Sequence, residues 1–330
     1  MTKEKSISVI IPNYNGIVLL PQILPPLFDA LNFTKLVYEV IISDDCSTDE
    51  SVVLIETHYP QIKLIKANTN KGFSPTINKG IFVAKYELIL LLNSDVKLTE
   101  DYFVNLLSYF DNDDTFGVMG RIIGWDDDII QDGGKYPSFH GAKIKTSRNY
   151  IPLESKAGDR LYSMYLSGAN ALVSRQKIIE LGGFDELFAP FYVEDFELSL
   201  RAWRLGWKCY YEHNAICRHQ TSVTIKSISS KNNIRKIYYR NKMFLHAIHL
   251  KGLCLVLWFL QLVPETIIHL ITGRLWYFAS LKMFITSFSK INNSKFFFKK
   301  LAMKEQKTIS LNEVVKSIQL SLANKMINKF

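Results

Sequence analysis

Acidic side chains with the potential for chemistry occur at three widely separated places, each next to an apolar run. They are Asp44 with Asp45, Asp95, and Glu194 with Asp195. Carboxylates can accept a hydrogen bond from a substrate N–H, hold a hard divalent cation, or remove a proton from a hydroxyl. A fold that brings such groups together could bind and transform a phosphorylated substrate.

Asp44 follows the β-branched run Val40-Ile41-Ile42 and admits two interpretations. At the end of a strand its carboxylate could accept the N3–H of a uracil or thymine ring, a donor that cytosine lacks. Alternatively, Asp44, Asp45 and Ser47 cap the helix that follows, as clusters of Asp, Ser and Thr often do. The residues alone leave both interpretations open.

Asp95 closes the tripeptide Asn93-Ser94-Asp95 after a wholly apolar strand. It could hold Mg²⁺ or Mn²⁺ against a diphosphate, because hard cations take oxygen ligands and share them with substrate phosphates. A helix N-cap explains the same tripeptide. His219, at the end of a late strand, could add an imidazole ligand for Mn²⁺, although a lone histidine is more often an ordinary surface or core residue.

Glu194 and Asp195 open a segment with helical periodicity. Acids in a first turn are favoured by the helix dipole, which is a purely structural explanation. The nearby aromatic residues Phe191, Tyr192 and Phe196 would, however, partly exclude water from these carboxylates. Desolvation raises the pKa of a carboxyl group toward the value that a general base needs.

The elements that must position these groups alternate regularly in the first hundred residues. Short apolar runs at 6–12, 38–43, 62–67 and 88–92 alternate with helical patterns at 18–31, 49–59, 75–85 and 100–110. Such alternation predicts an α/β fold with a doubly wound, mainly parallel sheet. In these sheets ligands bind beyond the carboxyl ends of the strands, where Asp44 and Asp95 stand.

The second half of the chain is less regular. Residues 117–155 predict loops and a short hairpin, residues 194–205 predict a helix, and two short strands are expected near 208–211 and 215–218. Neither a G-x-G-x-x-G sequence nor a Walker-type glycine loop occurs, which argues against dinucleotide-binding and P-loop proteins.

Charge is divided unevenly along the 330 residues. Residues 1–222 hold 22 Lys and Arg against 28 Asp and Glu, whereas residues 223–330 hold 18 against 3. The four cysteines are scattered, which excludes a zinc finger and indicates a reducing compartment. The first apolar run, Ile7–Ile11, is too short for a signal peptide, so a cytoplasmic location is expected.

The basic tail contains the longest apolar stretch, residues 252–273, with Glu265 as its only formal charge. Pro264 is expected to divide this stretch into two helices, each too short for the roughly 30 Å hydrocarbon layer of a bilayer. Aromatic residues and lysines nearby favour helices that lie on an anionic membrane surface. Helices packed without lipid and a true span are the alternatives, and nucleic acid is disfavoured because the tail is too continuously aliphatic.

Six segments, in this order, resemble the family-2 glycosyltransferases, whose nucleotide-binding fold is called GT-A. They are SVIIPNYNG (8–16), EVIISDDCSTDES (39–51), NTNKGFSPTINKGI (68–81), LILLLNSDVKL (88–98), LSGANALVSR (166–175) and GGFDELFAPFYVEDFELSLRAWRLGWK (182–208). Fainter similarity continues through YYRNK at 238–242, and this element together with His219 is similar to a rhamnosyltransferase-like branch. The resemblance implies a GT-A catalytic domain over residues 1–225 and a helical, membrane-associated extension over residues 226–330.

The resemblance also implies roles for individual residues. Asp195 would be the catalytic base, and Asp44 would read the pyrimidine base. The acceptor would lie near Glu194 and Gly168, and Mg²⁺ or Mn²⁺ would be bound by Asp95 and His219. The other nucleotide-binding residues would be Pro12, Tyr14, Asn70, Lys71, Gly72, Asn78 and Ser94.

The implied reaction moves a sugar, with inversion, from a UDP or dTDP sugar to a hydroxyl of a saccharide or lipid-linked glycan. It would serve surface polysaccharide synthesis at the inner face of the cell membrane. The sequence departs from the family at Asn93, where many members have Asp, and at Cys46, where glycine is usual. Two alternatives are a membrane-attached protein that binds sugar nucleotides without catalysis, and a sugar-nucleotide pyrophosphorylase, which would need a glycine-rich basic loop that PNYNG lacks.

Overall fold

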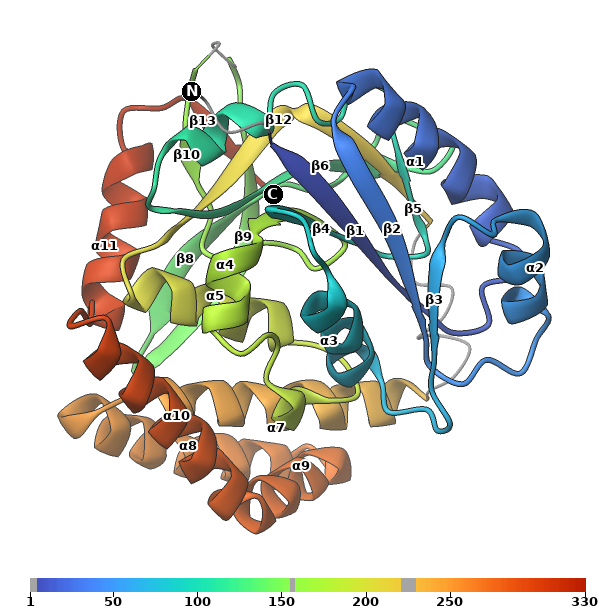
Figure 1. The fold of residues 1–330 in the computed structure, drawn as a ribbon. Helices are drawn as coiled ribbons and strands as arrows, with labels where there is room; N and C mark the ends of the chain where they lie inside the picture. The colour runs from blue at the N-terminus through green and yellow to red at the C-terminus, as the bar shows by residue number, and fades with distance from the viewer. Residues whose placement is uncertain (1–4, 155–157, 221–229) are drawn as a thin grey trace.

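The described part of the protein is built around a mainly parallel sheet of ten strands (Figure 1). The structure is a computed structural model and describes residues 5–154, 158–220 and 230–330, so the predicted boundary between residues 225 and 226 lies outside it. The strand order is β10-β12-β6-β11-β4-β1-β2-β3, with β5 paired to β12 and β7 to β6. The bounds are β1 Ser6–Asn13, β2 Val37–Asp44, β3 Lys63–Lys66, β4 Leu88–Leu92, β5 Val96–Leu98, β6 Thr115–Gly124, β7 Ile130–Asp132, β10 Leu161–Tyr162, β11 Asn170–Ser174 and β12 Lys208–His219.

The predicted α/β fold is confirmed, and the strands β3, β2, β1 and β4 form its parallel half. All five residues of β4 are buried, because helices cover both faces of the sheet. Neighbouring strands end at the same level: Asn13, the last residue of β1, pairs with Asp44, the last residue of β2. The carboxyl ends therefore form one edge, where a ligand site is expected.

Two hydrophobic cores lie on opposite faces of the sheet, because side chains along a strand alternate in direction. Ile7, Val9 and Ile11 belong to the core under α1, whereas Ile10 belongs to the core under α3 and α5. The helices of the first core are α1 (Leu20–Thr34) and α2 (Ser51–His58); those of the second are α3 (Phe73–Val83), α4 (Arg175–Glu180) and α5 (Glu194–Arg204).

Most of residues 117–155 lie in strands, so the prediction of loops in this region was wrong. β6 occupies the middle of the sheet, and its glycines serve close packing rather than turns: a Cβ at Gly120 would lie 2.4 Å from the carbonyl oxygen of Ala215. The hairpin expected here is long and consists of β8 (Gly134–His140) and β9 (Lys143–Pro152).

Two other predicted elements differ from the structure. Residues 100–110 form turns followed by the 3₁₀ helix η1 (Leu107–Asp111) instead of an α-helix. The two short strands expected after α5 are one strand, β12, whose register against β6 shifts between Glu212 and Ile216. Such a bulge leaves residues unpaired while the strand continues, which interrupts the sequence pattern without ending the strand.

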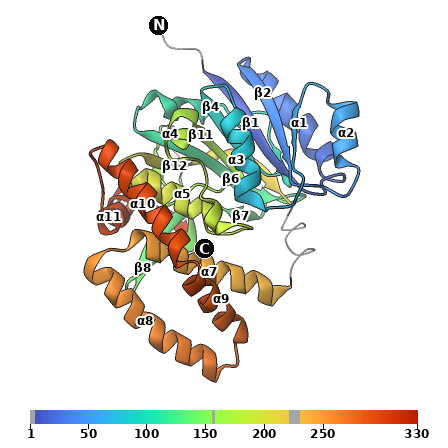
Figure 2. The ribbon, with the colours of Figure 1, turned by 60° about the horizontal axis from the view of Figure 1, so that its bottom comes forward.

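The C-terminal part of the chain is helical and lies below the sheet in Figure 2. Its helices are α7 (Lys231–His249), α8 (Gly252–Ile271), α9 (Leu275–Thr286), α10 (Phe288–Lys304) and α11 (Leu311–Leu322); a short 3₁₀ segment, η2 (Glu186–Phe188), precedes α5. The last strand, β13 (Ile327–Lys329), returns to pair with β9. α7 runs along the part of the molecule that contains the sheet, and α8 and α9 project away from that part.

α8 is a single helix, so the prediction that Pro264 divides this stretch was wrong. A proline removes one backbone hydrogen bond, and the helix continues on both sides of that gap. Among the described residues, α8 is the one helix whose length and composition would allow it to cross a bilayer, and 17% of its most apolar window is buried in the protein.

A buried ionic network joins α5 to the end of α7. The Arg201 guanidinium lies 2.9 Å from a carboxylate oxygen of Glu197, and the His249 Nε2 lies 3.2 Å from the other. Burial by itself would raise the pKa of Glu197, but Arg201 and His249 lower it overall. Glu197 is therefore an ionised, fully buried side chain that depends on its two partners.

We expect Glu197→Leu to lower the free energy of unfolding by about 3 kcal/mol, because Arg201 would remain buried without its carboxylate. Urea unfolding at neutral pH measures this change. Glu56→Leu is the matched control, since Glu56 pairs with Lys66 at the surface and its loss should change stability by less than about 1 kcal/mol. Equal losses in the two variants would contradict the assignment of a stabilising buried network.

Candidate active site

A cavity of about 540 Å³ opens at the carboxyl ends of β1 and β4. The elements that form its wall come from both halves of the chain and include α7, through Asn233 and Ile237. Of the residues predicted from the sequence, the wall contains Pro12, Tyr14, Asn70, Gly72, Ser94, Asp95, Gly168, Glu194 and Asp195. Asp44, Lys71, Asn78 and His219 do not line it.

Asp44 is buried behind the cavity wall. Its carboxylate accepts hydrogen bonds from the Asn13 side-chain amide at 2.8 Å and from the Ser47 backbone N–H at 2.9 Å. Asp44 thus holds the end of β1 and the loop after β2 together. The alternative prediction that Asp44 caps the following helix was wrong, because α2 begins at Ser51 without a side-chain cap.

Asp45, the next residue, does line the cavity. Its backbone N–H donates to the carbonyl of Asn13 at 2.8 Å, which turns its side chain the other way. The carboxylate accepts the backbone N–H groups of Lys71 at 2.9 Å and Gly72 at 2.8 Å. Each carboxylate oxygen can accept a further bond, so Asp45 orders the neighbouring loop and still presents an acceptor to the cavity.

Cys46 explains why glycine is usual at its position. Its backbone φ is 65°, in the left-handed region that glycine adopts without strain and that costs other residues of order 1 kcal/mol. The turn that separates the directions of Asp44 and Asp45 is therefore kept in this chain despite the cysteine.

Gly72 is required by a close contact at the mouth of the cavity. Its φ is +87°, and a Cβ there would lie 2.5 Å from the Cα of Pro190. The next residue, Phe73, donates its backbone N–H to the Pro190 carbonyl at 2.8 Å. Lys71 contributes its backbone to this loop, and its side chain is exposed.

Asn78 ties α3 to the segment before α5 and does not reach the cavity. Its side chain donates to the Phe184 carbonyl at 2.9 Å and accepts the Phe184 backbone N–H at 2.8 Å. The nucleotide-binding role that the resemblance implied for Asn78 has no direct contact to support it. Its observed contacts are structural.

Asp95 lies in the turn between β4 and β5, and the pairing of β5 with β12 brings His219 beside it. His219 pairs with Val96 in the sheet, and its Nε2 lies 3.5 Å from an Asp95 carboxylate oxygen. The other imidazole nitrogen, Nδ1, is 3.0 Å from the Gln131 side-chain oxygen. If that nitrogen carries the proton, Nε2 is left free as a ligand, an arrangement common among metal-binding histidines.

Unpartnered oxygens around Asp95 fit a hard cation. Asn93 Oδ1, Asp95 Oδ1 and Gln220 Oε1 are all buried without a hydrogen-bond partner, and buried oxygens of this kind normally have one. Within residues 5–154, 158–220 and 230–330 there is no group of three or more His, Cys, Asp or Glu side chains that could hold a metal. Asp95 and His219 therefore suit a cation that takes its remaining ligands from a substrate diphosphate and water.

Asp195 has the properties of a general base. Burial raises its pKa to about 6, although the Phe196 backbone N–H, 2.7 Å from its carboxylate, and the cation of Lys135 act in the opposite direction. Burial raises the pKa of Glu194 well above its usual value, and the adjacent charge of Asp195 raises it further. Glu194 is therefore the harder of the two to ionise, whereas Asp195, with a pKa of about 6, is ionised at neutral pH.

Gly168 lies opposite these acids. A Cβ at Gly168 would be 3.2 Å from the ring of Phe73 and 4.0 Å from the Cβ of Asp195. Any larger side chain would occupy the space between the ring and the acid.

Asn241 of α7 holds the loop that delivers the acids. Its side-chain amide donates to the carbonyl oxygens of Phe188, Phe191 and Tyr192 at 2.7–3.0 Å, and its own oxygen accepts from Arg240 at 2.9 Å. These bonds satisfy backbone groups in a loop where Tyr192 and the following residue have left-handed φ values.

Three residues that matter in this site were not among the binding and catalytic residues predicted from the sequence. Asp45 stood beside Asp44, and only the direction of its side chain distinguishes the two. Asn241 lies in the YYRNK element, which carried a faint resemblance. Lys135 gave no signal, because its cation reaches Asp195 from the β8–β9 hairpin, where loops had been predicted.

Comparison with known proteins places this geometry in a family. A sequence profile described as "Glycosyl transferase family 2" matches residues 8–182. A dolichyl-phosphate beta-glucosyltransferase of Dictyostelium discoideum is 30% identical over 99 residues, which cover 27% of this chain and 30% of that protein. An N-acetylglucosaminyl-diphospho-decaprenol L-rhamnosyltransferase of Mycobacterium tuberculosis is 24% identical over 207 residues, 54% of this chain and 66% of that protein.

The solved structures show the same fold. A crystal structure of GalNAc-T7 with UDP, GalNAc and Mn²⁺ matches 98% of this chain and 58% of its own, with a TM-score of 0.66 at 15% identity. The chain belongs to glycosyl transferase family 2 and has the GT-A fold. It spans only 20% and 30% of the length of the first two curated relatives.

The different directions of Asp44 and Asp45 lead to a prediction for nucleotide binding. Asp45→Asn should weaken UDP binding about tenfold or more, because a carboxylate acceptor for the uracil N3–H is lost. The preference for UDP over CDP should fall with it, since cytosine lacks that donor. Asp44→Asn is the matched control and should bind UDP normally in the folded fraction; isothermal titration of both variants measures this. Loss of UDP binding in Asp44→Asn alone would restore the original assignment.

Proposed function

We propose that the protein is a metal-dependent, inverting glycosyltransferase that moves a sugar from a UDP or dTDP sugar to a hydroxyl of a saccharide or lipid-linked glycan. The observation that carries this proposal is that one cavity contains both an ionised carboxylate with a raised pKa, Asp195, and a carboxylate with an unpartnered oxygen, Asp95. The cavity thus contains one carboxylate that can act as the base for the acceptor, Asp195, and a different carboxylate that can hold a cation, Asp95.

The nucleotide half of the donor is assigned to the edge formed by β1 and β2. Tyr14 and Pro12 line that side of the cavity, and Asp45 offers the acceptor for the N3–H of a pyrimidine ring. Asp95 and His219 would hold Mg²⁺ or Mn²⁺, which as a Lewis acid would stabilise the negative charge that gathers on the leaving diphosphate. The GalNAc-T7 structure, which contains UDP and Mn²⁺, supports this arrangement by analogy of fold.

Asp195 accepts the proton of the acceptor hydroxyl as its oxygen attacks the anomeric carbon. A new carbon–oxygen bond forms on one face of the sugar, and the bond to the diphosphate breaks on the other face, with its electron pair leaving on the diphosphate. This single displacement inverts the anomeric centre. Glu194 lies beside Asp195 in the cavity wall, where it can contact the acceptor.

The C-terminal helices support a location on the inner face of the cell membrane. The side of α8 that faces away from the protein is apolar, whereas its inward side carries Trp258, Gln261 and Glu265. A helix on the surface of a water-soluble protein has the opposite arrangement. The outward side consists of Leu253, Val256, Leu257, Leu260, Val263, Ile267, Ile268, Leu270 and Ile271, each more than 45% exposed.

The relatives' names support a lipid-linked acceptor. The Dictyostelium discoideum and Mycobacterium tuberculosis proteins are named for dolichyl phosphate and for a diphospho-decaprenol acceptor. An enzyme whose acceptor carries a long hydrocarbon chain works where that chain is anchored. An apolar helix on an otherwise basic tail suits an anionic membrane surface.

Asp195→Asn should bind UDP with normal affinity and lose about 10²–10⁴-fold in transfer rate, because the proton acceptor is removed. In the parent protein, kcat/KM should fall as the pH drops through about 6, where the Asp195 carboxylate becomes protonated and can no longer accept. Lys135→Met should move this acidic limb to higher pH, because the cation that lowers the pKa of Asp195 is lost. An acidic limb that is unchanged by Lys135→Met would argue against Asp195 as the titrating base.

Leu257→Glu combined with Leu260→Glu should release the protein from vesicles that contain anionic phospholipid, because two charges would enter the apolar face of α8. Co-sedimentation with the vesicles measures the bound fraction. Val53→Glu combined with Val104→Glu is the control, since both valines are exposed and lie outside the C-terminal helices. Sedimentation of the α8 variant at the parent level would contradict a membrane contact through this helix.

A further inference from the structure

A second space of about 160 Å³ adjoins the catalytic acids on the side away from β1. It shares Tyr192, Glu194 and Asp195 with the main cavity. Its other walls come from β9 and α7, including Tyr238 and Lys242. The base Asp195 therefore lines both spaces.

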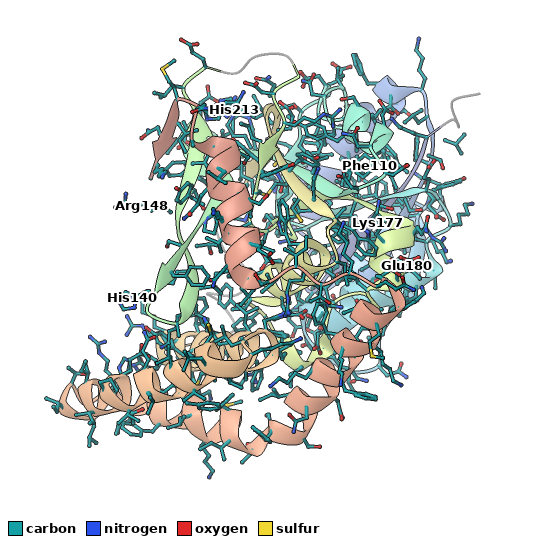
Figure 3. All side chains as sticks on the ribbon, turned by 90° about the vertical axis from the view of Figure 1, so that its left-hand side faces the viewer. Phe110, His140, Arg148, Lys177, Glu180 and His213 are labelled. Atoms are coloured by element: carbon teal, nitrogen blue, oxygen red, sulfur yellow. The ribbon has the colours of Figure 1, made fainter. Side chains whose placement is uncertain are left out.

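A third space, of about 360 Å³, continues from the second toward α8. The two share Thr146, Tyr238 and Lys242, and the third is enclosed by the β8–β9 hairpin together with α7, α8 and α9. Figure 3 shows the tip of this hairpin, marked by His140, reaching the C-terminal helices. The three spaces, referred to below as the path, thus adjoin one another through shared wall residues from Asp195 to α8.

The third space is positively charged. Lys143, Lys145 and Lys242 line it, and Glu265, which pairs with Lys143, is its only acidic lining residue. Burial lowers the pKa of Lys143, Glu265 opposes this, and the charges of Lys242 and Lys145 lower it further. The three ammonium groups are therefore close enough to repel one another, which is the arrangement expected around an anion.

An unpartnered donor completes the walls of this space. Trp258 is fully buried, and its indole nitrogen has no hydrogen-bond partner. An indole N–H can only donate, so it requires an acceptor that the protein does not supply. Burial lowers the pKa of the neighbouring His246 to about 3, so that imidazole is neutral and adds no charge of its own.

The path ends at an apolar surface. Trp258, Leu262 and His269 mark the buried side of α8 along this pocket, whereas Leu257 and Leu260, on the same turns, face outward and are 47% and 61% exposed. A ligand that fills the path therefore meets a carboxylate, then a cluster of cations, and then hydrocarbon.

We infer that this path is the acceptor site and that it takes a sugar joined through a phosphate or diphosphate to a long hydrocarbon chain. The sugar hydroxyl lies at Asp195, the phosphate lies among Lys145, Lys242 and the Trp258 N–H, and the chain follows the apolar face of α8. This inference rests on the proposed function and specifies its acceptor. The order of base, cations and hydrocarbon along one path is what selects this class of molecule over a free saccharide.

Farnesyl diphosphate serves as the probe, titrated calorimetrically into the full chain with saturating UDP and Mn²⁺ so that the donor cavity is filled. The combination Lys145→Met with Lys242→Met should weaken its binding at least tenfold, because two charged donors to the phosphate are lost. Lys63→Met with Lys316→Met, which removes the same charge from exposed positions, should bind the probe normally. Farnesol and inorganic diphosphate, each with only half of the recognised chemistry, should bind more weakly than farnesyl diphosphate.

Three results would overturn the inference. They are unchanged binding of the probe by Lys145→Met with Lys242→Met, binding of inorganic diphosphate as tight as that of the probe, and displacement of the probe by an equal concentration of phosphatidylglycerol, which would indicate an ordinary lipid headgroup. UDP titrations of the same variants separate this inference from the proposed function. If the parent protein fails to bind UDP, the proposed function is wrong; if UDP binds but the lysines do not affect the probe, only the acceptor assignment is wrong.

Discussion

The burial of two adjacent carboxyl groups, Glu194 and Asp195, is the constraint on which the rest of the structure depends. Two neighbouring acids with little water around them repel each other and destabilise the fold, so the chain must hold them in place. It does so from both sides. The Glu197–Arg201–His249 network fixes α5 against α7, and the Asn241 amide holds the backbone of the preceding loop. The raised pKa of Asp195 follows from this enforced desolvation.

α7 is consequently more than the first helix of a tail. It contributes Asn241 to the loop before the acids, Ile237 to the donor cavity and Lys242 to the two spaces behind it. The same helix packs against α9 and α10. The position of the basic, apolar helices is thereby linked to the geometry of the catalytic acids. The structure offers no sharp division between a catalytic part and an independent extension at this helix.

Much of the site was accessible from the residues, because parallel strands that are buried on both faces have a simple signature. The run before Asn93, Leu88–Leu92, is wholly apolar, and the runs before Asn13 and Asp44 are largely so. The ends of such strands must meet at one edge of the sheet. The predictions failed where a residue type had two uses. Residues 117–155 were predicted as loops and a short hairpin although most of them lie in strands, and a bulge in β12 was taken for the end of a strand. Pro264 was expected to interrupt α8, and the helix tolerates it.

The alternation of apolar runs and helical patterns thus settled the fold class and the edge of the sheet that holds the site, and the resemblance of six segments indicated the family. These depend on local patterns, which one chain displays in full. Which of two adjacent aspartates faces the cavity depended on a left-handed φ at Cys46, and the cation near Asp195 depended on a hairpin distant in sequence. The alignment of a carboxylate, three lysines and an apolar helix face depended on packing among β9, α7 and α8. Such juxtapositions arise from contacts between remote segments, and no periodicity along the chain records them.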